Sequence, residues 1–102
     1  MNRYIVSPQA VADLQAIWDY IGIKQGSPGA ASDQLVRFHE KFALLASQPL
    51  MGEIREDLRP GLRIFVADSY LILYYPLGDG IEVVGVVHAA RHIEWLFQSG
   101  EA

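Results

Sequence analysis

The chain has 102 residues, 51% of them hydrophobic, and a formal net charge of −4. This length favours one hydrophobic core and therefore a single domain over residues 1–102. Cysteine is absent, which excludes disulfides and thiolate metal sites and makes a reducing cytoplasm the expected compartment. No apolar run approaches the roughly 20 residues that span a bilayer, and we recognise no signal peptide, so we expect no membrane association.

The first half of the chain predicts a short strand and then a hairpin of two amphipathic helices. Residues 3–6 are β-prone. Ser7-Pro8 and Ser27-Pro28 are helix-start signals, because serine can cap a free N–H and proline suits the first helical position. We expect the first helix to end near 25–27 and the second before Pro49. Spacings of three and four give each helix an apolar face: Val11, Leu14, Ile17, Trp18 and Ile21, then Ala31, Leu35, Phe38, Phe42 and Leu45.

The second half of the chain predicts strands. Segment 51–61 is polar and closes with Pro60-Gly61, so we interpret it as a loop. Residues 91–97 are expected to form a short C-terminal helix. Turn residues separate three β-rich runs, which predicts an antiparallel meander over 62–66, 70–75 and 81–88. The fold class is therefore α+β, with both helices on one face of a mostly antiparallel sheet.

Catalytic and metal-binding patterns are weak. His88 and His92 are four residues apart, as zinc ligands on a helix can be, but no carboxylate completes such a motif. We interpret the histidines as surface or partner contacts, and we expect no metal and no cofactor. The aspartates of the two helices are expected on solvated outer faces: Asp13, Asp19 and Asp33.

The arginines are clustered, and two interpretations stay open. Four of them make up half of the eight lysine and arginine residues: Arg55, Arg59, Arg63 and Arg91. With their acidic neighbours they are consistent with a weak surface salt-bridge network. Alternatively, Arg63 opens the first strand of the meander and Arg91 follows the last, so neighbouring strands could bring them together. Guanidinium groups at a sheet end suit recognition of phosphate or carboxylate. That pattern indicates binding and not a reaction.

Aromatic residues predict a protein partner. An exposed apolar groove usually marks an interaction site, and an amphipathic helix is a common occupant. The residues in question are Trp18, Tyr20, Trp95 and Phe97. The alternative is that Trp18 and Tyr20 simply pack in the core, since apolar stripes of helices normally face inward.

The order and spacing of these residues resemble the ParE toxins of the ParE/RelE superfamily, from Tyr4 to about Phe97. The resemblance rests on several motifs taken together. They are Ser7-Pro8-x-Ala10; Asp13-Leu14-x-x-Ile17-x-x-Tyr20-Ile21; Leu45-x-x-x-Pro49-x-Met51-Gly52-x-x-Arg55-x-Asp57-Leu58-x-x-Gly61-x-Arg63; Tyr70-x-Ile72-x-Tyr74; and Val84-x-Val86-x-His88-x-x-Arg91.

The resemblance implies a toxin that a cognate ParD-like antitoxin holds inactive. The antitoxin of such a pair has an N-terminal DNA-binding ribbon–helix–helix region and a C-terminal segment that wraps the toxin. It implies DNA gyrase as the target. RelE-type relatives instead cut messenger RNA on the ribosome with basic residues and often a C-terminal tyrosine. Here no tyrosine or lysine follows Arg91 and the chain has only two lysines, which favours action on gyrase by binding over RNA cleavage.

The interpretation assigns roles to particular residues. The antitoxin groove would include Trp18 and Tyr20. The acidic net charge argues against sequence-specific binding of nucleic acid by this chain itself. His92 stands where ParE toxins usually carry an acidic residue, which weakens the case for Arg91. A non-toxic remnant that only binds antitoxin is a third hypothesis. The predicted target- or partner-binding residues are Arg59, Arg63, His88, Arg91, Trp95 and Phe97.

Overall fold

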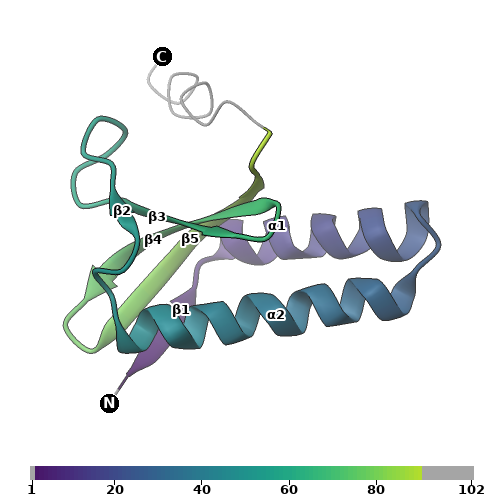
Figure 1. Ribbon diagram of the computed structural model, residues 1–102, viewed down its shortest axis with the longest axis horizontal. Coiled ribbons are helices and arrows are strands. Elements are labelled where there is room, and N and C mark those ends of the chain that lie inside the picture. The colour runs from purple at the N-terminus through teal and green to yellow at the C-terminus, as the bar shows by residue number, and fades with distance from the viewer. Residues whose placement is uncertain (1, 91–102) are drawn as a thin grey trace.

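The computed structural model describes residues 2–90, and the expected C-terminal helix at 91–97 lies outside them. Within residues 2–90 the chain forms a helical hairpin and a five-stranded sheet (Figure 1). The predicted α+β class is confirmed, and most predicted elements agree with the structure within two residues. In order the elements are β1 (Arg3–Val6), α1 (Pro8–Asp19), η1 (Tyr20–Lys24), α2 (Pro28–Ser47), β2 (Glu53–Ile54), β3 (Arg63–Ala67), β4 (Tyr70–Leu77) and β5 (Gly80–His88).

The sheet has the strand order β1-β5-β4-β3-β2. The pair β1–β5 is parallel and the other three pairs are antiparallel, which confirms the mostly antiparallel sheet. One prediction was wrong: segment 51–61 is not all loop, because Glu53 pairs with Ile64 and Ile54 with Arg63. A two-residue, exposed edge strand in a polar segment leaves no alternation of polar and apolar residues to detect.

The helix starts follow from local chemistry. Ser7 Oγ accepts a hydrogen bond from the N–H of Ala10 at 3.2 Å, as expected for an N-cap. Pro28 takes the first position of α2, but the Ser27 side chain makes no cap bond. α1 widens into the π-helical turn η1, and the chain then reverses at Gly26, whose φ of 69° favours glycine.

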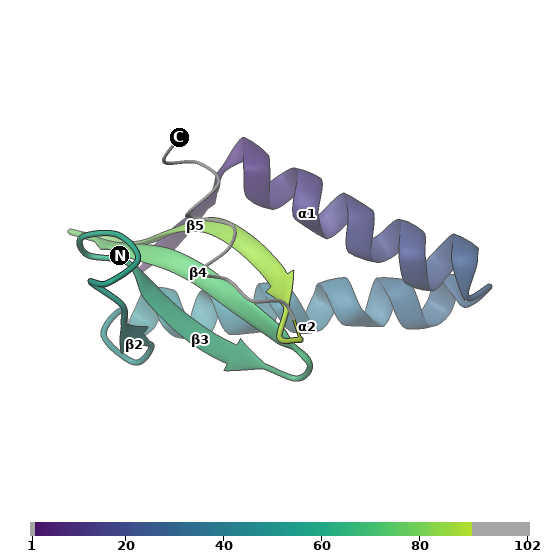
Figure 2. The same ribbon diagram turned by 90° about the horizontal axis from the view of Figure 1, so that it is seen from above.

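Both helices cover the same face of the sheet (Figures 1 and 2). The prediction that Val11 lies on the buried face of the first helix was wrong: Val11 is 52% exposed, and Ala10 takes the buried position instead. A smaller apolar cluster of Leu62, Ile64 and Leu73 lies on the opposite face. The main core joins the helices to the sheet through Ala10, Leu14, Phe38, Phe42, Leu45, Ile72, Tyr74, Ile81 and Val83.

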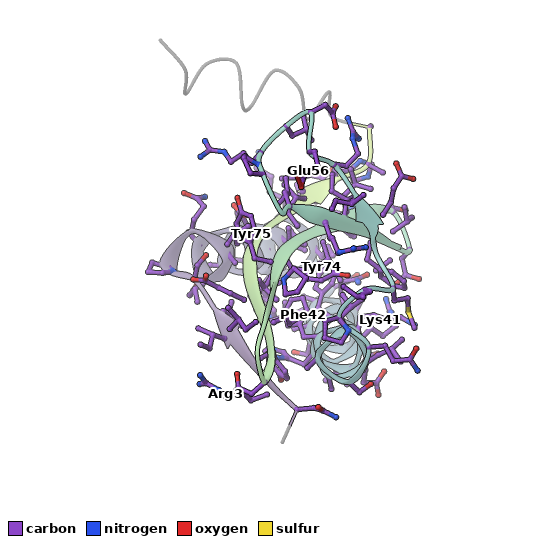
Figure 3. All side chains as sticks on the ribbon, turned by 90° about the vertical axis from the view of Figure 1, so that its left-hand side faces the viewer. Arg3, Lys41, Phe42, Glu56, Tyr74 and Tyr75 are labelled. Atoms are coloured by element: carbon purple, nitrogen blue, oxygen red, sulfur yellow. The ribbon has the colours of Figure 1, made fainter. Side chains whose placement is uncertain are left out.

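The hydroxyl of Tyr74 fastens the segment after α2 to the sheet (Figure 3). It donates to the carbonyl of Pro49 and accepts from the N–H of Gly52, both at 2.8 Å. Tyr74 is fully buried, and burial raises its pKa above the ordinary value, so the hydroxyl keeps its proton. Gly52 is required here because an added Cβ would stand 2.6 Å from the Tyr74 oxygen.

We expect Tyr74→Phe to lower the free energy of unfolding by about 2–3 kcal/mol, because two main-chain groups lose their partner at a buried site. The matched control is Tyr75→Phe on the next residue, which is half-buried; among the described residues no hydrogen bond to its hydroxyl is present, so its change should stay below about 0.5 kcal/mol. Urea denaturation of both variants measures the difference. Equal losses would show that the Tyr74 hydroxyl has no special role.

Candidate functional site: a cleft at the end of the helical hairpin

The helical hairpin extends past one end of the sheet (Figure 1), and a cleft of about 720 Å³ lies there. Its walls come from α1 and η1, from α2, from the turn between β3 and β4, and from the end of β5. Two residues predicted to bind partners, Tyr20 and His88, both line it. Aliphatic and polar groups alternate in the lining, which includes Asp13, Ile17, Tyr20, Ile21, Gln34, Tyr70, Val86 and His88.

Aromatic rings form one side of the cleft. The His88 ring stands edge-on to Tyr70 with centroids 5.4 Å apart, and Tyr70 stands edge-on to Phe38 at 5.2 Å. Burial, followed by the nearby Tyr20, raises the pKa of Tyr70 above its ordinary value. Tyr20 itself is 55% exposed on the π-helical turn. The cleft therefore offers flat aromatic surface and the neutral hydroxyl of Tyr70 to a partner.

Asp13 corrects the expectation that the helix aspartates are merely solvated. Its Oδ2 accepts a hydrogen bond from the N–H of Val86 at 3.0 Å, and its Oδ1 accepts from Gln9 Nε2 at 3.0 Å. A signal was present in the sequence: Asp13 is three residues after buried Ala10 and four before Ile17, which is the spacing of one helix face. The carboxylate thus joins α1 to the last part of β5.

Gln34 is buried at the base of the cleft and is 7% exposed. Its Oε1 accepts from Arg37 Nη2 at 2.9 Å, and Arg37 Nε donates to Asp68 at 3.3 Å. Within residues 2–90 its Nε2 has no hydrogen-bond partner. A buried amide donor without an acceptor is costly, so a bound group with an oxygen acceptor would satisfy it if it reached this depth.

The clustered arginines Arg55, Arg59 and Arg63 do not line this cleft. Arg63 Nη1 donates to the carbonyls of Gly52 at 2.7 Å and Leu50 at 3.1 Å, so this guanidinium holds the chain after α2. Arg55 pairs with Asp57 and, chiefly through that hydrogen bond, lowers the pKa of the Asp57 carboxyl; this pair agrees with the salt-bridge interpretation of the arginines. Arg59 is exposed in the same loop.

The strand register does not support the expected meeting of Arg63 and Arg91. Arg63 is level with Tyr74 and Val83, whereas Ala67 is level with Tyr70 and His88. The start of β3 and the end of β5 therefore lie at opposite ends of the sheet, because both strands run the same way on either side of β4. Arg91 itself lies outside the described residues, as do Trp95 and Phe97.

Trp18 and Tyr20 do not share a groove. Trp18 lines a separate apolar hollow of about 550 Å³ with Val11, Leu35 and His39. Its Nε1 donates to Ser32 Oγ at 3.4 Å, and its ring fills the space beside Gly22, where an added Cβ would come within 2.8 Å. Trp18 thus joins the two helices outside the main core, while Tyr20 faces the cleft.

No metal-binding cluster emerges from the described part of the chain. Residues 2–90 contain no group of three or more His, Asp or Glu side chains placed to hold a metal ion. In the same residues, none of the helices is both long and apolar enough to cross a membrane. The features that stand out are the cleft, the apolar hollow and the loop that carries Arg59.

A helical hairpin on a five-stranded, mostly antiparallel sheet, with an open cleft beside the hairpin, defines a small α+β domain. The family model described as "ParE toxin of type II toxin-antitoxin system, parDE" matches residues 4–93. The chain belongs to this family of toxins.

Individual relatives agree with the family. The chain is 32% identical over 94 residues to Toxin ParE1 of Mycobacterium tuberculosis, covering 91% of this chain and 95% of that one. It is 38% identical over 92 residues to Toxin RelE2 of Caulobacter vibrioides, covering 89% and 99%. A solved structure described as a chromosomal ParDE TA system from P. aeruginosa shares the fold, with a TM-score of 0.71 at 22% identity and coverage of 86% and 96%.

Replacing Asp13 by alanine is expected to lower the free energy of unfolding by about 1–3 kcal/mol, because the N–H of Val86 loses its acceptor. Asp19→Ala is the matched control on the same helix: Asp19 is exposed, and removing a negative charge near a helix C-terminus is neutral or slightly stabilising. Thermal or urea unfolding compares them. A D13A variant as stable as D19A would contradict the role given to Asp13.

Proposed function

We propose that this toxin is held inactive by a cognate ParD-like antitoxin and that, when free, it inhibits DNA gyrase by binding rather than by catalysis. The observation that carries the proposal is the match to the ParE family across residues 4–93. The match to two relatives named ParE1 extends over 95% and 94% of their lengths. The family resemblance supplies gyrase as the target.

The hydrogen bonds of the basic residues support binding over RNA cleavage. Cleavage of RNA needs positive charge and a proton donor that converge on one phosphate. The Arg63 guanidinium donates to two main-chain carbonyls, and the register places it at the other end of the sheet from His88. We therefore treat Arg63 as a residue that positions the 49–52 segment, and not as a direct target contact.

Exposed apolar side chains support an antitoxin that lies along the helical hairpin. Four large apolar residues of the hairpin are more than half exposed: Val11, Tyr20, Ile23 and Val36. Such a surface on a small domain is typical of a protein interface. We propose that the antitoxin covers the cleft at Tyr20 and His88 and reaches the hollow at Trp18. Bound in this way, the antitoxin would cover the cleft and the apolar hollow.

Target recognition is assigned to the remaining predicted residues. Arg59 is exposed in the loop before β3, and a guanidinium at the surface can make charge-assisted contacts with an acidic group of a target. Arg91, Trp95 and Phe97 stay predictions from the sequence. We propose that these four residues contact gyrase.

A ribosome-dependent RNA endonuclease is the second candidate, because the chain is also similar to a toxin named RelE2. The two functions differ in what stops first in the cell. Gyrase inhibition damages DNA, whereas RNA cleavage stops translation and leaves shortened transcripts.

Induced expression of this chain alone is expected to arrest bacterial growth and to induce a DNA-damage reporter. Purified toxin should then raise the amount of gyrase-linked cleaved DNA. Arg59→Ala should weaken this effect by about tenfold, the usual scale for one charged contact. Lys24→Ala, an exposed cation at the far end of the hairpin, is the matched control and should act like wild type.

The other outcomes separate the hypotheses. Arrest with transcript cleavage and no reporter induction would replace gyrase by the ribosome as the target. No arrest, with antitoxin binding intact, would identify a non-toxic remnant.

A further inference from the structure

One face of the sheet has no helix over it in the part of the chain that the structure describes. Both helices cover the face that holds the main core (Figures 1 and 2). The opposite face, here called the second face, is apolar and is formed mainly by β3, β4 and β5. At its centre Leu62, Ile64 and Leu73 are buried. A sheet with two apolar faces needs a layer on each of them. Half-buried side chains surround the centre of the second face: Leu58, Leu71, Tyr75, Val84 and Val87.

A β-bulge in β5 enlarges the second face. Leu73 is opposite Gly85 but Tyr74 is opposite Val83, so Val84 is the extra residue. In a regular strand Val84 and Val87, three residues apart, would point to opposite faces. Because of the bulge, both pack against the cluster on the second face. The second face is therefore apolar up to the end of β5.

The chain leaves β5 beside this apolar surface. The N–H of Ala89 donates to the Ser69 carbonyl at 2.8 Å, so the chain is still held beside β4 at this point. His88 lines the cleft on the hairpin side, whereas the chain that follows it leaves the sheet on the side away from the hairpin (Figure 1). Residues 91–102 come next and lie outside the described residues. A helix over 91–97 would be about 10 Å long, enough to cross two neighbouring strands about 4.8 Å apart.

The sequence of this segment is complementary to the second face. Ile93, Leu96 and Phe97 are three and four residues apart, so on the predicted helix they share one side. Arg91 and Trp95, four residues apart, share the other side. An apolar side of a short helix is buried in a folded domain only against another apolar surface, and the second face adjoins the end of β5.

We propose that residues 91–97 fold back onto the second face, with Ile93, Leu96 and Phe97 packed against β4 and β5. Arg91 and Trp95 then face outward. The occupant of the second face is thus a segment of this same chain, attached directly to the strand that it covers. Phe97 holds the segment in place in addition to the target contact proposed above.

The docked segment also assembles the residues assigned to target recognition. The loop of residues 55–61 adjoins the second face, because Leu58 packs against its cluster, and this loop carries the exposed Arg59. Docking would bring Arg91 and Trp95 to the same side of the sheet as Arg59, opposite the hairpin. This step rests on the proposed function, because it takes gyrase as the target of that surface.

A nitroxide label at the end of the segment tests the docking on the full chain. The chain has no cysteine, so Ser99→Cys gives a single attachment site for the label. We expect the label to broaden the amide NMR signals of Leu71 and Val87 much more strongly than those of Val11 and Val36, which are exposed on the hairpin. A label that leaves the signals of β4 and β5 sharp, or that broadens both sets equally, overturns the proposal.

Two aspartate substitutions test which side of the segment is held. Leu96→Asp puts a charge on the apolar side and should abolish the broadening at Leu71 and Val87. Gln98→Asp is the matched control, because it adds the same charge to the side that bears Arg91 and should keep the broadening. Unchanged signals from α1 and α2 show that both variants fold. If L96D keeps the broadening as Q98D does, the apolar side does not hold the segment and the inference fails.

The gyrase assay separates this inference from the proposed function. L96D should give about tenfold less gyrase-linked cleaved DNA than Q98D, the scale expected when one buried leucine is lost from the docked segment. If wild-type toxin gives no such DNA while the label reports docking, the proposed function fails and the docking stands. If the label reports docking but L96D acts on gyrase as Q98D does, the docked segment does not form the target surface and that step is wrong.

Discussion

The buried hydroxyl of Tyr74 is the interaction on which the arrangement of this small domain depends. It joins the sheet to one carbonyl, of Pro49, and one N–H, of Gly52, in the segment that follows α2, and Arg63 adds two more hydrogen bonds to the same segment. A segment without regular structure would otherwise leave buried main-chain groups unsatisfied. With this end fixed, α2 is held along the sheet, and the opposite end of the hairpin is free to overhang it.

The overhang separates the molecule into two ends with different chemistry. At the Tyr74 end, the side chains of Tyr74 and Arg63 form hydrogen bonds with the main chain that follows α2. The exposed Arg59 lies in the loop before β3. At the other end the π-helical turn, Tyr70 and the end of β5 surround an open cleft. Exposed apolar side chains beside an open cleft are typical of a protein interface, in agreement with the antitoxin partner proposed above.

Much of the fold followed from the sequence because its signals are local. The serine–proline pairs, the spacing of Leu14, Phe38 and Phe42, and the turns between β-rich runs each act over a few residues. The site was harder to predict from the sequence because it depends on the register of the strands. Whether Arg63 lies near His88 is decided by strand direction, and whether the N–H of Val86 faces Asp13 depends on the one extra residue, Val84, in β5. Neither leaves a periodic trace.

Asp13 and Trp18 likewise depend on contacts between segments that are far apart in the sequence. A carboxylate on the core side of a helix is costly unless a donor meets it, and the donor here is a main-chain N–H of a strand 73 residues further on. No helix pattern can reveal such a partner. Trp18 and Tyr20 are two residues apart on one helix, which turns them to different sides. The Trp18 ring therefore packs beside Gly22 and bonds to Ser32 of the other helix, whereas the Tyr20 ring stays exposed at the cleft.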